Sequence, residues 1–335
     1  MLIIKNFGFA STYHMVLGLL FVCALSTSAD ASGPVINIKF SHVVAADTPK
    51  GEAAEFLKKE LEARSGGRIK VSVYPNSQLY KDKEAVTALL MGSVQLICPS
   101  TSKLTTIVPE FQVVDIPFLF PVMDDIHRGF DGGLGGRLDA LLAKKGFRRL
   151  AYWDSGYKQL GNSVRPVRLP GDVKGMKLRI MSSKVLEDQF RHIGANPQVI
   201  AFSEVYTALE QGVIDGQENT WSNTYSQKFH EVQKYITETN HGYLGYVLLT
   251  SKMFWNSLPP GLQTVFTESV KAATEYERNI AREINEREKQ KIIKIGKTDV
   301  ITLTYQERKE WIKTFEPFLR KYPKWQELVD AARNP

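Results

Sequence analysis

The sequence contains little cysteine and lacks the common catalytic and metal-binding motifs. Only two of its 335 residues are cysteines, Cys23 and Cys98, which excludes a disulfide-rich scaffold. The six histidines do not show a zinc-site spacing. A nucleophile elbow and a phosphate-binding loop are also missing. These absences predict a protein that is not an enzyme and that uses neither a metal nor a cofactor. Cys98 lies in an apolar run, where a buried and inert thiol is expected.

The chain has no long run of basic residues and no long run of acidic residues. There are 43 basic and 36 acidic residues, which give a net charge of +7, and they are interspersed. Long basic runs with interleaved aromatic residues are missing, so nucleic acid is excluded as a partner. The modest positive excess favours an anionic ligand. A hydrophobic content of 43% is ordinary for a globular protein, and the length suggests about two domains.

Long apolar runs are also missing, with one short exception near the N-terminus. Lys5 precedes the apolar residues 15–25, and Ala29 and Ala31 occupy the small-residue positions of a cleavage site. The run has about half the length of a membrane span. We therefore predict a signal peptide over residues 1–31, cleaved near Ala31, and export to the periplasm. A membrane anchor is the alternative; otherwise the mature protein is not membrane-inserted.

Strand and helix patterns alternate along the first hundred residues of the mature chain. Strands are predicted over residues 35–40, 68–74 and 94–98, and helices over residues 49–64 and from an N-cap at Asp82 to Gly92. This order is typical of an α/β fold with largely parallel strands.

One helical segment is repeated later in the chain. Residues 84–92 and 204–212 share five of nine positions, and each segment ends in glycine before a short apolar stretch. The repeat suggests two lobes that each place one helix–glycine–strand unit beside a shared cleft. Apolar residues at helical spacing over residues 260–293 predict a helix of about 50 Å. That helix is either a strut crossing both lobes, two consecutive helices or a dimer seam.

Two polar residues are expected at the ends of neighbouring strands. Arg179 ends the segment G-M-K-L-R, and Asn219 ends D-G-Q-E-N. A guanidinium group can donate two parallel hydrogen bonds to a carboxylate, which a lysine cannot do. An asparagine offers one acceptor and two donors. On these residues alone, a solvated strand arginine and a turn asparagine remain the alternatives.

Ten short motifs are spread over essentially the whole mature chain. In chain order they are F-S-H-V-V-A, T-P-K-G, Y-P-N-S-Q-L, P-F-L-F, G-M-K-L-R, G-A-N-P, A-F-S-E-V-Y-T-A-L, D-G-Q-E-N, K-F-H-E-V-Q-K-Y and T-N-H-G-Y. In these motifs the chain resembles the solute-binding proteins of TRAP transporters (tripartite ATP-independent periplasmic systems), in particular the dicarboxylate-binding branch.

This resemblance implies a two-lobed periplasmic-binding-protein fold with a hinge and a long helix spanning both lobes. Lobe I is expected over residues 32–155 plus 245–284, and lobe II over residues 156–244 plus 285–335. The implied function is capture of a small organic acid, with a dicarboxylate as the expected ligand, and its delivery to the membrane permease subunits. A sensor that reports to a membrane receptor and a secreted enzyme acting on an organic acid are the alternatives.

The resemblance also implies a set of ligand-binding residues. Arg179 takes the position that pairs with the ligand carboxylate, and Asn219 binds the same group. Phe202 packs against the carbon skeleton of the ligand, or in the core. Lys158 stands where many relatives have arginine. It offers a positive charge, but it cannot donate the two parallel hydrogen bonds of a guanidinium group. The further candidates, which lie near cleft-lining positions of relatives, are Ser100, His42, Asp82 and Trp153.

The chain departs from the family pattern directly after Asn219. Relatives commonly have proline there, whereas this chain has Thr220 followed by Trp221. The effect of this bulky aromatic residue beside the asparagine on the shape of the pocket is left open by the sequence. The sequence therefore leaves the identity of the organic acid open.

Overall fold

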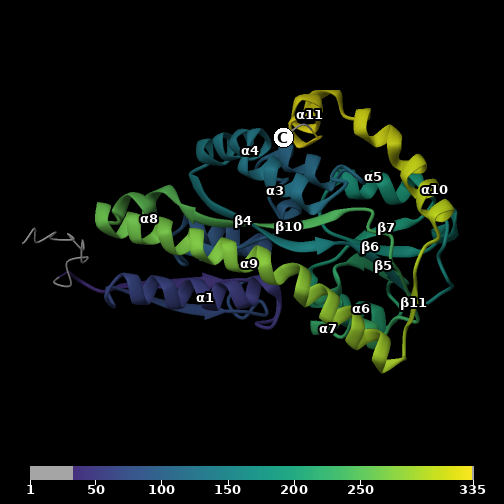
Figure 1. Ribbon diagram of the computed structural model, residues 1–335, viewed down its shortest axis with the longest axis horizontal. Helices are drawn as coiled ribbons and strands as arrows, with labels where there is room; N and C mark the ends of the chain where they lie inside the picture. The colour runs from purple at the N-terminus through teal and green to yellow at the C-terminus, as the bar shows by residue number, and fades with distance from the viewer. Residues whose placement is uncertain (1–32, 334–335) are drawn as a thin grey trace, which may run out of the picture.

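The computed structural model describes residues 33–333, which form two β-sheets flanked by helices (Figure 1). This arrangement confirms the predicted α/β fold class. The predicted signal peptide and its cleavage site near Ala31 lie outside the described residues. Within residues 33–333, none of the helices combines the length and the apolar character that a bilayer crossing requires.

The first sheet has five strands in the order β2-β1-β3-β10-β4. Its strands are β1 (Ile36–Ser41), β2 (Ile69–Tyr74), β3 (Leu96–Ile97), β4 (Phe147–Tyr157) and β10 (Tyr243–Ser251). Helices α1 (Pro49–Arg64) and α2 (Asp82–Leu90) connect the first three strands. As their order predicts, β1 pairs in parallel with β2 and with β3.

The second sheet has six strands in the order β11-β9-β5-β8-β6-β7. Its strands are β5 (Gln159–Asn162), β6 (Lys177–Ile180), β7 (Asn196–Val199), β8 (Gly216–Asn219), β9 (Tyr235–Thr237) and β11 (Asp299–Ile301). Both sheets are mixed, so the prediction of largely parallel pairing is wrong for β5 and β10. Each runs antiparallel to both of its neighbours, because these strands lie where the chain passes from one sheet to the other.

The remaining helices cover the faces of the two sheets. They are α3 (Met123–Asp131), α4 (Gly133–Lys144), α5 (Lys184–His192), α6 (Val205–Glu210), α7 (Trp221–Ser226), α8 (Lys252–Ser257), α9 (Pro260–Ile295), α10 (Tyr305–Phe315) and α11 (Gln326–Arg333). Short 3-10 helices are η1 (Thr101–Lys103), η2 (Pro109–Asp115), η3 (Pro170–Val173), η4 (Phe202–Glu204), η5 (Phe229–Glu231), η6 (Glu316–Arg320) and η7 (Pro323–Trp325). The last helix, α11, packs against α3 and α4 (Figure 1), so the end of the chain returns to the helices beside the first sheet.

Capping residues set the helix ends next to the first sheet. Thr48 is the N-cap of α1, and its hydroxyl accepts a hydrogen bond from the Gly51 amide at 3.2 Å. The N-cap of α2 is Lys81, and Asp82 is the first helical residue. The prediction that Asp82 is the N-cap is therefore wrong by one position, and Asp82 lines the pocket described below.

The two repeated segments adopt the same local structure. Helix α2 is followed by Gly92 and β3, and helix α6 is followed by Gly212 and β8. Both glycines have positive φ angles, 75° and 68°, which a side chain would disfavour. The strands β3 and β8 are internal strands of their respective sheets. The predicted pair of helix–glycine–strand units is thus confirmed.

Helix α9 is one continuous helix of 36 residues, which spans about 54 Å. It packs against α1 and β4 at one end and against α7 at the other (Figure 1). The Asn285 amide nitrogen donates to the Ser155 carbonyl oxygen at 2.7 Å, and its oxygen accepts from the Ser222 amide at 3.1 Å. A single side chain thereby connects β4, α9 and α7, so the helix is the predicted strut rather than two consecutive helices.

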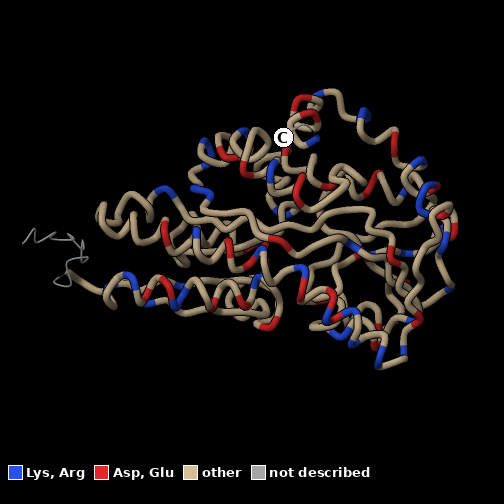
Figure 2. The backbone as a smooth tube through the Cα atoms, viewed as in Figure 1, with Lys and Arg blue, Asp and Glu red and all other residues tan. Residues whose placement is uncertain are grey.

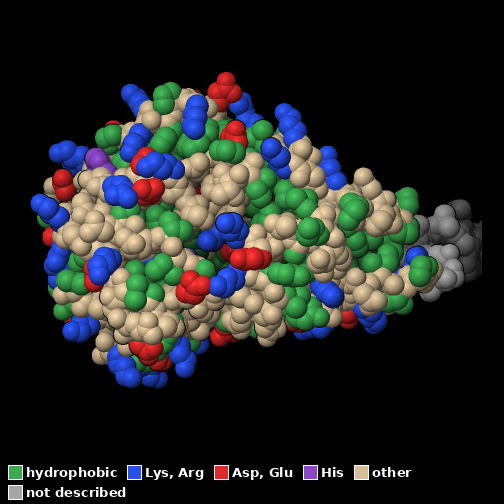
Figure 3. Space-filling view, turned by 180° about the vertical axis from the view of Figure 1, so that it is seen from behind, with side chains coloured by type: hydrophobic (Ala, Val, Ile, Leu, Met, Phe, Trp, Pro, Cys, Tyr) green, Lys and Arg blue, Asp and Glu red, His purple; other side chains and the backbone are tan. Residues whose placement is uncertain are grey.

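Charged residues are distributed over the molecule without a basic block. Basic and acidic residues alternate along α1 and α9 (Figure 2), and on the opposite face they are scattered among apolar side chains (Figure 3). The helices bury the apolar side chains of both sheets. Cys98 is buried, as predicted, and burial raises the pKa of its thiol, because a thiolate would lose its hydration.

Candidate ligand-binding site

A largely buried polar pocket lies between the two sheets. The free space between its walls is small, about 20 Å³ for a water-sized molecule, so the two walls lie close together. The side of the first sheet contributes Val43, Val44, Asp82, Ser100, Lys103, Leu244 and Tyr246. The side of the second sheet contributes Arg179, Met181, Phe202, Glu218, Asn219 and Asn223. Five of the eight predicted site residues are therefore brought together.

Arg179 is a buried cation on β6, and only 2% of its surface is exposed. Its Nε donates to the Ile200 carbonyl oxygen at 3.0 Å, which fixes the guanidinium plane. Within residues 33–333, its two terminal nitrogens have no hydrogen-bond acceptor. Burial lowers the pKa of Arg179 to about 10, against the opposing effects of Glu218 and Asp82, so the group stays charged at neutral pH. A buried guanidinium with two available nitrogens is suited to a carboxylate.

Asn219 ends β8, the strand next to β6. Its side-chain oxygen accepts from the Thr220 amide at 3.1 Å and from the Asn223 amide nitrogen at 3.0 Å. Both contacts use the acceptor, so the Asn219 amide nitrogen is left as a donor within the pocket. The Asn223 amide nitrogen also donates to the Tyr246 hydroxyl at 3.2 Å. This chain of contacts connects the second sheet to β10 of the first.

Lys158 lies next to the pocket but is not among its lining residues. It is the single residue between β4 and β5, and its ammonium group pairs with Glu218 at 2.8 Å. The other Glu218 oxygen lies 2.8 Å from His241 Nε2. Burial would raise the pKa of Glu218, but Lys158 and His241 outweigh this and hold it at about 2. The structure therefore places the Lys158 charge against Glu218, on the strand that carries Asn219.

Three further predicted residues line the pocket: Ser100 and Asp82 on the side of the first sheet, and Phe202 on the side of the second. The Ser100 hydroxyl lies 3.4 Å from the Met181 sulfur atom, so the two walls are in contact. Asp82 is buried, and burial raises the pKa of its carboxyl group although Lys50, Lys103 and Arg179 oppose the change. Phe202 borders the pocket and also packs on Phe229, with ring centroids 5.9 Å apart. Its packing in the core is thus observed, and its contact with the carbon skeleton of the ligand stays a prediction.

Trp153, His42 and Trp221 are not among the lining residues. Trp153 is fully buried in the core of the first sheet, where its indole nitrogen donates to the Thr274 hydroxyl at 3.0 Å. His42 is buried, and burial, followed by the nearby Lys50, lowers its pKa to about 3. Trp221 begins α7 and packs against Ile236 and Ile292. Trp221 therefore does not line the pocket, because its ring packs toward α9.

Sequence reasoning missed eight of the lining residues. Glu218 and Asn223 lie one and four positions from Asn219, so proximity in the chain could have indicated them. Lys103 lies three positions after Ser100, so it is also close in the chain to a predicted site residue. The others, for which the sequence gave no polar signal or no nearby motif, are Val43, Val44, Met181, Leu244 and Tyr246.

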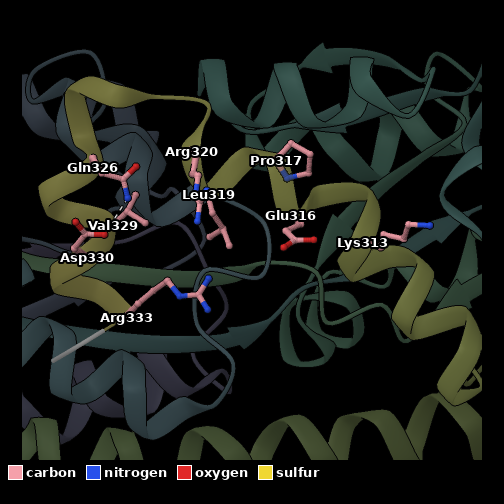
Figure 4. Close-up of a pocket in the computed structure, with 9 residues that line it drawn as sticks. All are labelled: Lys313, Glu316, Pro317, Leu319, Arg320, Gln326, Val329, Asp330 and Arg333. Atoms are coloured by element: carbon pink, nitrogen blue, oxygen red, sulfur yellow. Dashed lines mark hydrogen bonds between the residues drawn. The ribbon is translucent and has the colours of Figure 1, made fainter.

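A second hollow lies at the surface between α10, η6 and α11 (Figure 4). Its charged residues, among them Lys313, Arg320 and Asp330, are exposed. Charges in water gain little from a single ligand contact, so the pocket between the sheets is the stronger candidate. In the part of the chain that the structure describes, His, Cys, Asp and Glu side chains do not gather into a group of three suited to a metal ion.

The fold and the pocket together define a two-sheet protein with a buried polar pocket, lined by a charged guanidinium group, between its halves. Comparison with known proteins agrees. The family described as "Bacterial extracellular solute-binding protein, family 7" (DctP) matches residues 40–324. The chain therefore belongs to this family, the solute-binding proteins of TRAP transporters, as the sequence motifs predicted.

Several relatives match along most of their length. The C4-dicarboxylate-binding periplasmic protein DctP of Rhodobacter capsulatus is 44% identical over 295 residues, 88% of each chain. The C4-dicarboxylate-binding protein DctB of Bacillus subtilis is 42% identical over 287 residues, 86% of this chain and 82% of that protein.

Solved structures show the same fold. A TRAP periplasmic solute-binding protein from Shewanella oneidensis with bound succinate is 43% identical, with a TM-score of 0.87 over 90% of this chain and 99% of that one. One from Pseudomonas aeruginosa with bound L-malate is 39% identical, with a TM-score of 0.84 over 86% of this chain and 100% of that one.

Proposed function

We propose that the mature chain works in the periplasm, where it binds a four-carbon dicarboxylate such as succinate or L-malate and delivers it unchanged to the membrane permease subunits of a TRAP transporter. The observation that carries this proposal is the buried Arg179, whose terminal nitrogens are available beside the Asn219 amide between two sheets. The names of the relatives and the ligands of the similar structures support a dicarboxylate.

The proposed mechanism is closure of two lobes around the ligand. We propose that lobe I comprises residues 32–155 plus 245–284, and that lobe II comprises residues 156–244 plus 285–335. The chain passes between the sheets at Lys158, between β9 and β10, and along α9, which are the natural positions for a hinge. A ligand that touches both walls binds the closed form better and therefore shifts the population toward it. The permease then recognises the closed form.

The expected affinity follows from the size of the ligand. Succinate has about eight non-hydrogen atoms, and a ceiling of about 1.5 kcal/mol per atom limits binding to roughly 12 kcal/mol, close to nanomolar. Closure and desolvation reduce this value. We expect dissociation constants from high nanomolar to micromolar.

The test is a binding screen of the mature protein against organic acids. Thermal shift selects compounds that raise the melting temperature, because a ligand that binds only the folded state stabilises it. Calorimetry then measures each affinity. We expect succinate, fumarate or L-malate to bind more tightly than butyrate and than a sugar acid such as D-gluconate. The proposal fails if the preferred ligand has no carboxylate, or if the recovered ligand is chemically changed.

A further inference from the structure

Lys103 is the second cation that lines the pocket. It ends η1, directly after β3, and therefore stands on the side of the first sheet, across the pocket from Arg179 on β6 of the second sheet. Lys103 also borders the outer hollow at the pocket mouth, together with Lys81 and Glu204. Lys103 thus lies at the boundary between the outer hollow and the buried pocket.

The Lys103 ammonium group has no partner in the part of the chain that the structure describes. Within residues 33–333, no carboxylate lies within 4.0 Å of it and it makes no side-chain hydrogen bond, although the side chain is partly buried. The two other lysines near the pocket are satisfied. Lys50 donates to the Cys98 carbonyl oxygen at 2.8 Å, and Lys158 pairs with Glu218. A partly dehydrated ammonium group without a partner favours an anion beside it.

Asp82 is the acidic residue that influences the charge of Lys103 most strongly. Both line the pocket, and Asp82 counteracts the lowering of the Lys103 pKa that burial produces. Lys103 and Asp82 do not form an ion pair, because their charged atoms are more than 4.0 Å apart. Asp82 therefore helps to keep Lys103 charged while its ammonium group remains available.

We propose that Lys103 binds the second carboxylate of the ligand and makes the protein selective for dianions. This inference deepens the proposed function and rests on it. One carboxylate pairs with Arg179 and Asn219 on the second sheet, and the other pairs with Lys103 on the first. A dianion thus ties both walls together by charge, whereas a monoanion of equal length leaves Lys103 without a partner. The contact between the second carboxylate and Lys103 then explains both the selectivity for dianions and the closure of the two lobes.

The test compares Lys103→Met with wild type by calorimetry, using succinate and succinamate. Succinamate has nearly the same shape, but an amide replaces one carboxylate. Wild type is expected to prefer succinate by about 10- to 100-fold, the effect of one charge-assisted contact. In the variant this preference falls to less than about 3-fold, because succinate loses affinity and succinamate does not. Lys103→Arg keeps the preference. The control is Lys83→Met, an exposed lysine on α2 that borders only the outer hollow.

The outcomes separate this inference from the proposed function. If Lys103→Met weakens both compounds by the same factor, or leaves the succinate preference intact, Lys103 is not the second anchor, although the protein is still a dicarboxylate receptor. If wild type binds neither compound, the proposed function itself fails. The melting temperature of each ligand-free variant shows that it is folded, and Lys103→Gln replaces Lys103→Met if the latter does not fold.

Discussion

Replacing Arg179 with methionine should weaken binding and yet stabilise the ligand-free protein. The side chain is buried, and burial lowers its pKa to about 10 from an ordinary value of 12.5. The difference corresponds to roughly 3 kcal/mol that the folded, ligand-free protein expends to hold the charge. Methionine has a similar length and carries no charge. The substitution should therefore remove this unfavourable term.

The expected sizes follow from the contacts. Loss of the hydrogen bond from Arg179 Nε to Ile200 costs about 1 kcal/mol, which leaves a net gain of roughly 1–2 kcal/mol. For a chain of this size, that gain raises the melting temperature by about 2–5 °C. Two lost charge-assisted bonds to the ligand weaken binding by at least ~100-fold. Stability and affinity should thus change in opposite directions.

The assay is thermal melting with and without succinate, followed by calorimetry. Lys177→Met is the matched control, because Lys177 lies on the same strand but is exposed. The control should keep the wild-type ligand-induced shift. The reasoning is refuted if Arg179→Met melts well below wild type and still shows the full shift with succinate. Such a result would mean that Arg179 supports the fold and does not contact the ligand.

Three further predictions concern groups around the pocket. Lys81→Ala removes an ion pair with Glu204 at 2.5 Å across the mouth of the pocket. Because both side chains are about half exposed, calorimetry should show at most ~5-fold weaker ligand binding. In about 1 M salt the substitution should have no effect on binding. Glu218→Gln leaves the buried Lys158 charge without its carboxylate, so urea denaturation should show a loss of about 3–5 kcal/mol. Burial raises the pKa of Asp115 to about 6 from 3.8, so the folded state holds this proton more tightly than the unfolded state, and stability falls as pH rises through that window. Asp115→Asn should therefore gain melting temperature over wild type between pH 4 and pH 7.

Each of these predictions has a clear contrary result. An effect of Lys81→Ala that persists in high salt would mean that the pair is not screened by solvent. A Glu218→Gln protein as stable as wild type would show that Lys158 does not depend on that carboxylate. For Asp115, the contrary result is a difference in melting temperature that is the same at both pH values, with the exposed Asp330→Asn as the control.

Local patterns predicted local structure well. The helix expected over residues 49–64 is α1, with the same bounds, because its apolar spacing, Thr48 cap and terminal glycines all act within a few residues. The strand ends that carry Arg179 and Asn219 were located for the same reason. The antiparallel pairing of β5 and β10 was not predicted, because it arises where the chain crosses between sheets, and no local signal marks such a crossing.

Lys103 and Tyr246 show where sequence reasoning failed in the site. They come from η1 and β10, which are far apart in the chain and far from the motif that carries Arg179. Tyr246 reaches the pocket because β10 pairs between β3 and β4. Hydrophobic periodicity only marks such a strand as buried. It cannot show which of its side chains face a pocket formed by another sheet.

Lys158 shows that a charged residue in a binding motif can contact either the ligand or another residue of the site. The sequence predicted a positive group near the ligand, and the structure places it 2.8 Å from Glu218, which is itself a lining residue. Without Lys158, the Glu218 carboxylate would be the strongest nearby acceptor for Arg179 and would compete with the ligand for that guanidinium. Pairing with Lys158 and His241 occupies both Glu218 oxygens. Lys158 can thus support ligand binding without touching the ligand, because it keeps the terminal nitrogens of Arg179 available.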